Sequence, residues 1–392
     1  MIEIKEKSKC CGCNACLNIC PKNCIKMEYD SEGFLYPVVN KDLCIDCNLC
    51  NNVCHLVNNK KLKNDNEIRK FYAAYNKNLN ILKDSSSGGV FWLMVEEIIK
   101  NNGVVYGVEQ SSTFIVRHSR SESLKESEKF RKSKYLQSDI GECFKEIKKD
   151  LKDNRIVLFS GTPCQVAGLY SYLNNDYENL YTCEVICHGV PSRAVLKKYI
   201  DEINNKFNSN VRNIIWRDKI NGWGPNHVSL ELDDGRKISS ISQKNIFQKG
   251  FLDNIYLRPS CYECKYAKLP RIADISLADF WGYEGNLIED NNNNGISLVI
   301  VSSANGEKLF GSIKMNLFYH AVDEDYAKSK SRHSYLPPKK NGDRKRFFKD
   351  LNTYKFSKLV DKYIICEKIN YRVMRKFRRI IDKKIYGFYR EY

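Results

Sequence analysis

Eight cysteines near the start of the chain have the spacing of iron–sulfur ligands. They form two runs of four at a constant offset of 34 residues: Cys10, Cys13, Cys16 and Cys20, then Cys44, Cys47, Cys50 and Cys54. This spacing is typical of paired [4Fe–4S] clusters, in which the fourth cysteine of each run ligates the other run's cluster. We therefore assign Cys10, Cys13, Cys16 and Cys54 to a first cluster, and Cys44, Cys47, Cys50 and Cys20 to a second.

Zinc and disulfides explain these runs less well. Zinc sites use paired C-x2-C knuckles instead of triplets with a trailing fourth cysteine. A disulfide framework needs an oxidising compartment. Residues 1–57 are therefore predicted to be a two-cluster unit of the bacterial ferredoxin type. Pro21 follows the first run and His55 the second. His55 is predicted to cap or hydrogen-bond, with ligation as the minor alternative, and Cys11 and Cys24 to be buried small side chains.

The bulk composition limits the fold and the location of the protein. A chain of 392 residues exceeds one small domain and suggests two or three units. No stretch approaches the roughly 18 apolar residues that are needed to span a bilayer. With 17 cysteines and no apolar export signal, a reducing cytoplasm is expected.

Beyond a polar linker at 58–70, the region 71–335 alternates strand and helix patterns, which predicts an α/β domain. A hairpin is expected between the cysteine runs, from 25–29 to 34–39. Strands are expected at 71–75, 104–108, 156–159, 180–185, 211–216, 228–232 and 297–301. Helices are expected at 88–100, 143–151, 163–173 and 192–205. The fold class is therefore a small ferredoxin-like unit followed by a larger α/β domain and a basic helical tail.

Two predicted strand-to-helix turns are rich in small residues. They are Ser85–Gly89 and Ser160–Cys164. Such turns let backbone N–H groups and a helix N-terminus approach a phosphate. Neither turn matches the dinucleotide fingerprint or the P-loop, so each suits an ordinary capped helix equally well.

Four more cysteines form a candidate third metal site. Cys164 and Cys187 follow predicted strands, where α/β sheets place their sites, and Cys261 and Cys264 form a C-x2-C pair. The four thiols suit an iron–sulfur cluster or a structural zinc, and simple burial is the remaining alternative.

Six ordered motifs resemble the coenzyme F-420 hydrogenase/dehydrogenase beta-subunit family. They are Ser87–Val90, Ser133–Ser138, Gly161–Gln165, Cys187–Ser192, Arg258–Cys264, and the pair Ala273–Ser276 with Asp279–Gly282. With the cysteine-rich unit in front, the resemblance covers about four-fifths of the chain.

This resemblance implies FAD, a third [4Fe–4S] cluster and hydride exchange with a deazaflavin coenzyme. Carried onto this sequence, the third cluster takes Cys164, Cys187, Cys261 and Cys264. The candidate flavin contacts are Ser87, Gly88, Gly89, Ser133, Lys134, Tyr135, Gln137, Ser138, Gly161 and Thr162. His188 is a candidate proton donor, with a hydrogen bond that orients the adjacent thiolate as the alternative. Asp279 and Trp281 are either site-lining or structural. A flavin accepts electrons singly and delivers them in pairs, which suits it to join clusters to hydride chemistry.

The region 336–392 is strongly basic and is predicted to be an amphipathic helical tail. Residues 339–392 hold 18 Lys and Arg against 6 Asp and Glu. Apolar residues from Ile369 to Phe388 fall on one helical face and basic residues mainly on the other. This pattern favours an anionic membrane surface, and hence a peripheral position at its inner face, or equally a helix docked on its own domain. No nucleic-acid-binding fold accompanies the charge, so no nucleic-acid partner is expected.

Together these features predict an iron–sulfur flavoprotein oxidoreductase. Its clusters exchange electrons with an external carrier protein, and its flavin exchanges hydride with an organic substrate. Bacterial relatives of this family with the same ferredoxin fusion resemble accessory enzymes of cell-surface polysaccharide assembly, so the resemblance implies polysaccharide biosynthesis as the pathway, which a membrane-seeking tail would fit. The alternative is a non-catalytic electron-transfer subunit whose catalytic partner is another polypeptide.

Overall fold

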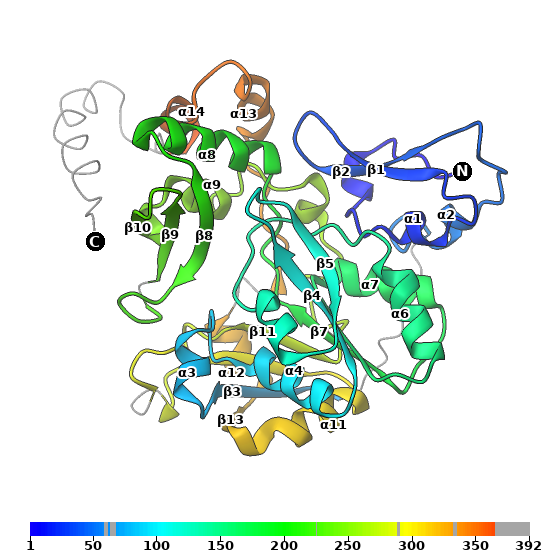
Figure 1. Ribbon diagram of the computed structural model, residues 1–392, viewed down its shortest axis with the longest axis vertical. Helices are drawn as coiled ribbons and strands as arrows, with labels where there is room; N and C mark the ends of the chain where they lie inside the picture. The colour runs from blue at the N-terminus through cyan, green and yellow to red at the C-terminus, as the bar shows by residue number, and fades with distance from the viewer. Residues whose placement is uncertain (59–61, 63–67, 225, 288–290, 332–334, 365–392) are drawn as a thin grey trace.

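The computed structural model describes residues 1–58, 62, 68–224, 226–287, 291–331 and 335–364. The N-terminal unit, dark blue in Figure 1, contains one hairpin and three short helical turns. Its elements are η1 (Lys7–Lys9), α1 (Ala15–Ile19), β1 (Ile25–Tyr29), β2 (Leu35–Val39) and α2 (Leu49–Asn52). The strands pair antiparallel between the two cysteine runs, as predicted.

The 34-residue repeat of the sequence is also a repeat of the backbone. Asn14 and Asn48 precede α1 and α2, with φ of 61° and 59°. Asparagine tolerates this left-handed conformation better than most residues. Each asparagine therefore turns the chain directly after the second cysteine of its run, so that a helix carries the third.

The large domain is built on a mixed eight-stranded sheet, which agrees with the predicted α/β character. The strand order is β13-β3-β12-β11-β7-β6-β4-β5, and the central strands β11, β7, β6 and β4 are parallel neighbours. The strands are β3 (Lys70–Asn76), β4 (Val104–Gln110), β5 (Val116–Ser121), β6 (Val157–Gly161), β7 (Leu180–Val185), β11 (Ile275–Asp279), β12 (Ser297–Val301) and β13 (Leu317–Val322).

Helices cover both faces of this sheet. Alternate strand residues point to opposite faces, so Val157 and Phe159 of β6 pack with α6 and α7, whereas Leu158 packs with α4 and α11. The helices of this domain are α3 (Leu79–Lys83), α4 (Val90–Lys100), α5 (Leu124–Ser127), α6 (Cys143–Lys152), α7 (Pro163–Leu173), α11 (Ala304–Ile313) and α12 (Glu324–Lys330), with turns η2 (Glu128–Phe130) and η5 (Lys314–Asn316).

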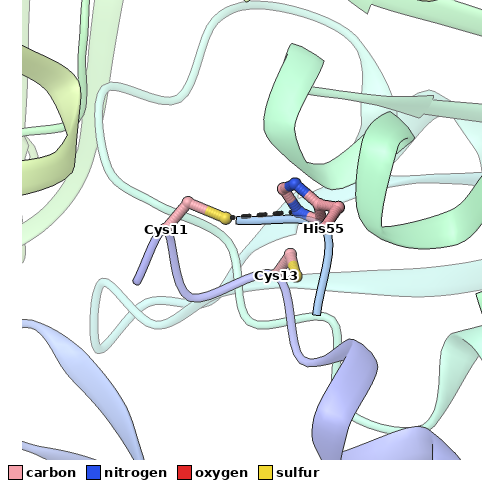
Figure 2. A group of neighbouring side chains, drawn as sticks. All are labelled: Cys11, Cys13 and His55. Carbon is pink, nitrogen blue, oxygen red and sulfur yellow. Dashed lines mark hydrogen bonds between the residues drawn. The ribbon is translucent and has the colours of Figure 1, made fainter. Parts of the chain in front are cut away.

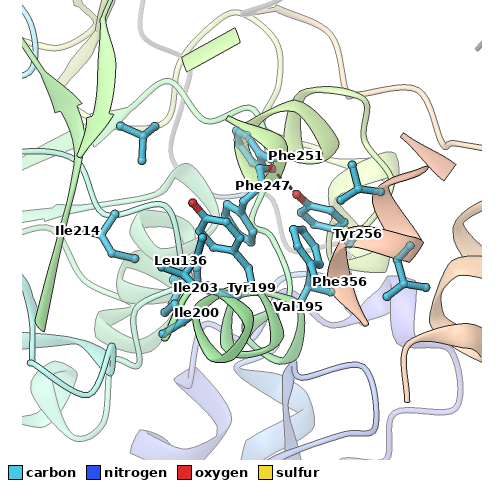
Figure 3. Packing of buried hydrophobic residues seen from close by; sticks show 14 of the residues in the cluster. Leu136, Val195, Tyr199, Ile200, Ile203, Ile214, Phe247, Phe251, Tyr256 and Phe356 are labelled. Atoms are coloured by element: carbon cyan, nitrogen blue, oxygen red, sulfur yellow. Dashed lines mark hydrogen bonds between the residues drawn. The ribbon is translucent and has the colours of Figure 1, made fainter. Parts of the chain in front are cut away.

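A second, three-stranded sheet stands beside the large one and has its own aromatic core (Figure 1). Tyr199, Phe247, Tyr256 and Phe356 are buried at its centre (Figure 3). The elements around it are α8 (Arg193–Phe207), β8 (Val211–Asp218), β9 (His227–Leu232), β10 (Lys237–Ile241), η3 (Ser242–Lys244), α9 (Ile246–Leu252), α13 (Arg344–Asp350) and α14 (Phe356–Tyr363).

The start of the basic C-terminal region packs into this aromatic core. Phe347 of α13 and Phe356 and Leu359 of α14 are almost completely buried there. The amphipathic helix predicted from Ile369 lies outside the described residues. In the part of the chain that the structure describes, every helix is too short or too polar to cross a bilayer.

Candidate metal and cofactor sites

The two cysteine sets assigned from spacing line two separate cavities. The first cavity contains Cys10, Cys13, Cys16 and Cys54. The second contains Cys20, Cys44, Cys47 and Cys50. In each run, the helix that carries the third cysteine ends before the fourth: α1 ends directly before Cys20, and α2 ends two residues before Cys54. The fourth cysteine of each run therefore lines the cavity of the other run's set. Every cysteine in the described residues is a free thiol, which suits metal ligation better than a disulfide framework.

The third cysteine set gathers beyond the ends of β6 and β7. Cys164 lies in the first turn of α7, Cys187 follows β7, and Cys261 and Cys264 lie in and after the turn η4 (Pro259–Glu263). Burial raises the pKa of the Cys187 thiol well above its usual range, and the three other thiols of the set raise it further. Cys164, Cys261 and Cys264 are therefore electrostatic neighbours of Cys187.

The third set also borders a cavity of about 630 Å³, lined by Cys164, Cys261 and Cys264. Four converging soft thiolates are the donor set of an iron–sulfur cluster or of zinc. The residues therefore fit the third metal group that the resemblance implies.

Cys11, outside the ligand spacing, lies between the first and third sets. It lines both the first cavity and the large cavity. Its Sγ lies within 4.8 Å of Cys13 Sγ, and the neighbouring thiols of Cys13 and Cys164 raise the pKa of Cys11 well above its usual range. Cys11 is buried, as predicted, and its side chain lies between the two sets.

His55 completes this junction (Figure 2). Its Nε2 lies 3.7 Å from Cys11 Sγ, and its Nδ1 is hydrogen-bonded to the Tyr266 hydroxyl. The ligand atoms of Cys11, Cys13 and His55 all lie within 4.8 Å of one another. Because Cys13 belongs to the first set, we interpret His55 as an orienting hydrogen-bond partner at the junction.

Gly168 brings α7 against the first set. A Cβ at this position would lie 2.8 Å from Cys13 Cβ and 2.9 Å from Cys13 Sγ. Gly168→Ala should therefore displace Cys13, costing about 1–3 kcal/mol through overpacking and lowering the iron content of the chain. Thermal unfolding and iron analysis measure both effects.

Gly311→Ala is the matched control for Gly168→Ala. Gly311 lies inside α11, where an added Cβ meets no atom of the described residues within 4 Å. This change should leave iron content intact and stabilise the helix by about 0.5–1 kcal/mol. Equal iron content in the two variants would contradict the contact between α7 and Cys13.

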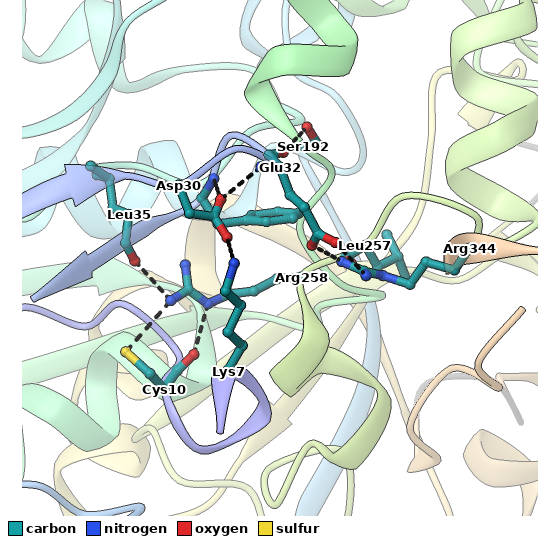
Figure 4. A network of polar contacts seen from close by, with 10 residues as sticks. Lys7, Cys10, Asp30, Glu32, Leu35, Ser192, Leu257, Arg258 and Arg344 are labelled. Atoms are coloured by element: carbon teal, nitrogen blue, oxygen red, sulfur yellow. Dashed lines mark hydrogen bonds and ion pairs between the residues drawn. The ribbon is translucent and has the colours of Figure 1, made fainter. Parts of the chain in front are cut away.

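Arg258 connects the large domain to the first cysteine set (Figure 4). It is 1% exposed, and its Nε donates to the Cys10 carbonyl at 2.8 Å while Nη2 donates to the Leu35 carbonyl at 2.8 Å. Nη2 also lies 3.5 Å from Cys10 Sγ. A buried guanidinium therefore contacts a proposed cluster ligand directly.

Further buried polar contacts fix the N-terminal unit on the large domain. The Gln137 amide donates to the Cys11 carbonyl at 2.5 Å and accepts from Arg258 at 3.0 Å. Arg344 forms a two-pronged ion pair with Glu32, at 3.0 and 2.5 Å. Because these groups are largely buried and mutually satisfied, the unit is held in one position.

The predicted flavin stretches meet at Ser86. Its hydroxyl accepts from Ser133 N at 2.9 Å and lies 3.0 Å from Ser133 Oγ. Gly89, with φ of 73°, leads into α4, and none of the described side chains caps that helix N-terminus. Lys219 Nζ donates to the carbonyls of Leu82 at 2.8 Å, Ser87 at 2.9 Å and Asn294, which hold its charge beside this turn. An open helix N-terminus with a fixed positive charge nearby suits a phosphate group.

The 133–138 stretch runs from this turn to the clusters. Ser133 binds Ser86 at one end, and Gln137 binds the Cys11 carbonyl at the other. Four extended residues span at most about 14 Å, so the turn and the first cysteine set are joined by a short path. Between them, the Tyr135 ring packs on Trp216, with centroids 5.6 Å apart.

The polar atoms beside Tyr135 also suit a bound cofactor. Trp216 Nε1 and Arg217 Nε are buried without a hydrogen-bond partner among the described residues. Buried donors of this kind normally have partners, so a ligand with acceptor atoms fits here. Arg217 is otherwise held by an ion pair with Asp279, and Trp281 stacks on Trp223 with ring centroids 3.9 Å apart. Both contacts suit a structural role and a site-lining role equally well.

The remaining predicted contacts lie elsewhere. The Thr162 backbone N–H donates to the Gln165 side chain at 3.0 Å, so it is not open to a ligand, and the Thr162 hydroxyl lies 3.3 Å from Cys164 Sγ. The turn that contains Gly161 and Thr162 therefore faces the third cysteine set.

The side chain of Gln165 also forms a hydrogen bond with Ser138, and Lys134 donates to the carbonyls of Lys129 and Arg131. His188 Nε2 is paired with Asn254 Oδ1 at 2.7 Å.

Comparison with known proteins identifies two domains. Residues 9–56 match the 4Fe-4S dicluster domain, and residues 154–325 match the family described as the C terminus of the coenzyme F420 hydrogenase/dehydrogenase beta subunit. The resemblance predicted from the motifs is thus confirmed. A chain of the F420-reducing [NiFe] hydrogenase complex from Methanosarcina barkeri is 15% identical; the match covers 67% of this chain and 89% of that chain, with a TM-score of 0.47. No curated protein matches.

Proposed function

We propose that this chain, which joins a 4Fe-4S dicluster domain to the C-terminal domain of a coenzyme F420 hydrogenase/dehydrogenase beta subunit, is an electron-transfer flavoprotein subunit. The three cysteine sets would hold the second cluster, the first cluster and the third metal group in series with FAD, and these groups would carry electrons in either direction. The third cysteine set would hold a [4Fe–4S] cluster and not zinc, because zinc carries no electrons.

One observation carries this proposal: the third cysteine set adjoins the first. Cys11 lines both the cavity of the first set and the cavity bordered by Cys164, and α7 carries both Cys164 and the close contact at Gly168. A separate structural zinc site has no reason to adjoin a cluster, whereas an electron route requires it. Arg258 and Gln137 hold this contact fixed, so electrons need no domain movement to cross it.

The Ser85–Gly89 turn, Ser133 and Lys219 would hold the phosphates of FAD, and Tyr135, Trp216 and Arg217 its ring system. When bound, a flavin converts single electrons into the pairs that hydride transfer requires. The residues themselves bind and orient. We assign the chemistry on an organic substrate to a partner subunit, because His188 is engaged by Asn254. The polysaccharide role stays a prediction.

Anaerobic purification tests the proposal. We expect about twelve irons, about twelve sulfides and one FAD per chain. Size-exclusion of the native protein should show a stable complex with a catalytic subunit. Stoichiometric zinc in place of four irons would refute the third cluster, and a lone monomer that turns over an organic substrate would favour an enzyme.

FAD binding should depend on pH through Lys219. Burial lowers the pKa of Lys219 to about 7, although attraction to Asp279 acts in the opposite direction. The other charged groups nearby are Arg217, Asp84 and Lys132. A phosphate at the turn stabilises the protonated amine, so binding takes up a proton above pH 7. The Kd of FAD should therefore rise by up to tenfold per pH unit between about pH 7 and 9.

Two variants separate this effect from general pH sensitivity. Lys219→Met should weaken FAD binding at pH 7 and remove the slope, as measured by flavin fluorescence. Lys100→Met, an exposed lysine at the far end of α4, should behave like the original protein. A slope that survives in Lys219→Met would rule out this lysine as the phosphate partner.

A further inference from the structure

Large apolar side chains are exposed around the second cysteine set. Leu43, Ile45 and Leu49 expose 55%, 58% and 40% of their surface, and Cys47 in the same loop is also exposed. Ile45 and Leu49 line the cavity that holds this set. We call Leu43, Ile45 and Leu49 the apolar rim. Clustered exposed apolar groups are unfavourable in water unless they form an interaction site.

The rim lies on the side of the unit that points away from the large domain. The first cysteine set faces inward, since Cys10 contacts Arg258 and Cys13 contacts Gly168. Helix α1 packs on α6 and α7, whereas α2, which begins at Leu49, packs on α1 (Figure 1). The second set is therefore the outermost redox position, and the rim surrounds it.

The charge distribution indicates what kind of molecule meets the rim. Residues 1–57 carry six lysines and seven acidic residues, a net charge of −1, so the rest of the chain carries +18. The rim itself needs an apolar, nearly neutral counterpart. The net charge of +17 of the whole chain favours the approach of an acidic molecule over a longer range, and the nearly neutral rim then makes the apolar contact.

We propose that the apolar rim is the docking site of a small acidic one-electron carrier protein whose own redox centre is surrounded by apolar residues. This inference rests on the proposed function. The reaction is one electron from the reduced carrier to the second cluster, which oxidises the carrier and reduces the cluster, with no bond or proton transferred. Encounters of this kind bury less than about 1,200 Å², which a three-residue rim with its polar surroundings can supply.

The test compares two reductants in stopped-flow experiments on the full, cluster-loaded chain. A reduced acidic two-cluster ferredoxin serves as the protein donor and dithionite as the small donor. Leu43→Glu should slow reduction by the ferredoxin at least tenfold, because it places a charge in the rim and repels the acidic donor. Reduction by dithionite should be unchanged. Ile45→Gln provides a second rim variant if Leu43→Glu lowers the iron content.

Met315→Glu is the matched control, since Met315 is 73% exposed but lies in η5 on the large domain. It should accept electrons from ferredoxin at the original rate, and that rate should fall as salt is raised. The docking proposal is overturned if the rim variants react with ferredoxin like the control, or if the original protein reacts with dithionite but not with ferredoxin. Failure of dithionite to reduce the flavin would instead contradict the proposed function.

Discussion

Cys261→Ser should reduce the iron content from about twelve to about eight per chain and isolate the flavin from the dicluster domain. Cys261 is one of four thiols at the third site, and burial raises its pKa to about 12, so the thiol needs a metal to ionise it at neutral pH. Loss of one ligand from a closed four-thiolate site removes the cluster that joins the two ends of the route.

Two readouts distinguish this result from general unfolding. Dithionite should still reduce the two remaining clusters, while flavin reduction through them slows by more than tenfold. Cys183→Ala is the control, because Cys183 is a buried core residue of β7 and should keep about twelve irons. Full iron content in Cys261→Ser would contradict the assignment of the third site.

Arg258→Met should lower the reduction potential of the first cluster and loosen the N-terminal unit. Its guanidinium stays positive and lies 3.5 Å from Cys10 Sγ, so it stabilises the extra electron of the reduced cluster. We expect the reduction equilibrium to shift at least tenfold, about 59 mV for a one-electron couple. The carbonyls of Cys10 and Leu35 would also lose their donor, at a cost of about 1–3 kcal/mol each.

Arg344→Met provides the matched control for Arg258→Met. Arg344 is also a buried guanidinium at the contact with the N-terminal unit, where it pairs with Glu32 (Figure 4). The described cysteines do not contact it, so its loss should lower the unfolding temperature and leave the potential of the first cluster unchanged. If anaerobic EPR titration gave the same first-cluster potential for both variants, the prediction that Arg258 raises this potential would be wrong.

Elements with strong local patterns were predictable from sequence. β7, β12 and α7 have the bounds that their patterns predict. β12 is a buried and mainly apolar run, α7 starts at a proline, and β7 is buried over its first five residues although it contains Thr182 and Glu184. β11 was missed because ISLAD is short and partly polar, although it pairs between β7 and β12 at the centre of the sheet. β5 and β13 are edge strands with mixed polarity, for which the local signal is weak.

At the site, spacing identifies ligands but not what lies between them. The cysteine sets follow from local repeats and one C-x2-C pair; the first and second sets each line one cavity, and three members of the third set line another. The position of Cys11 between two sets depends on how the N-terminal unit docks on α7, which no local pattern encodes. Arg258 belongs to a recognised motif, yet its contact with Cys10 spans 248 residues of sequence. Long-range contacts of this kind require the fold.

The most direct test is an anaerobic reductive titration that counts electrons per chain. Three clusters that each take one electron and a flavin that takes two should absorb about five electrons, with all centres reaching equilibrium. An end point of about two electrons, with no flavin absorbance, would show that only the dicluster domain is redox-active. That result would contradict a continuous electron route through this chain.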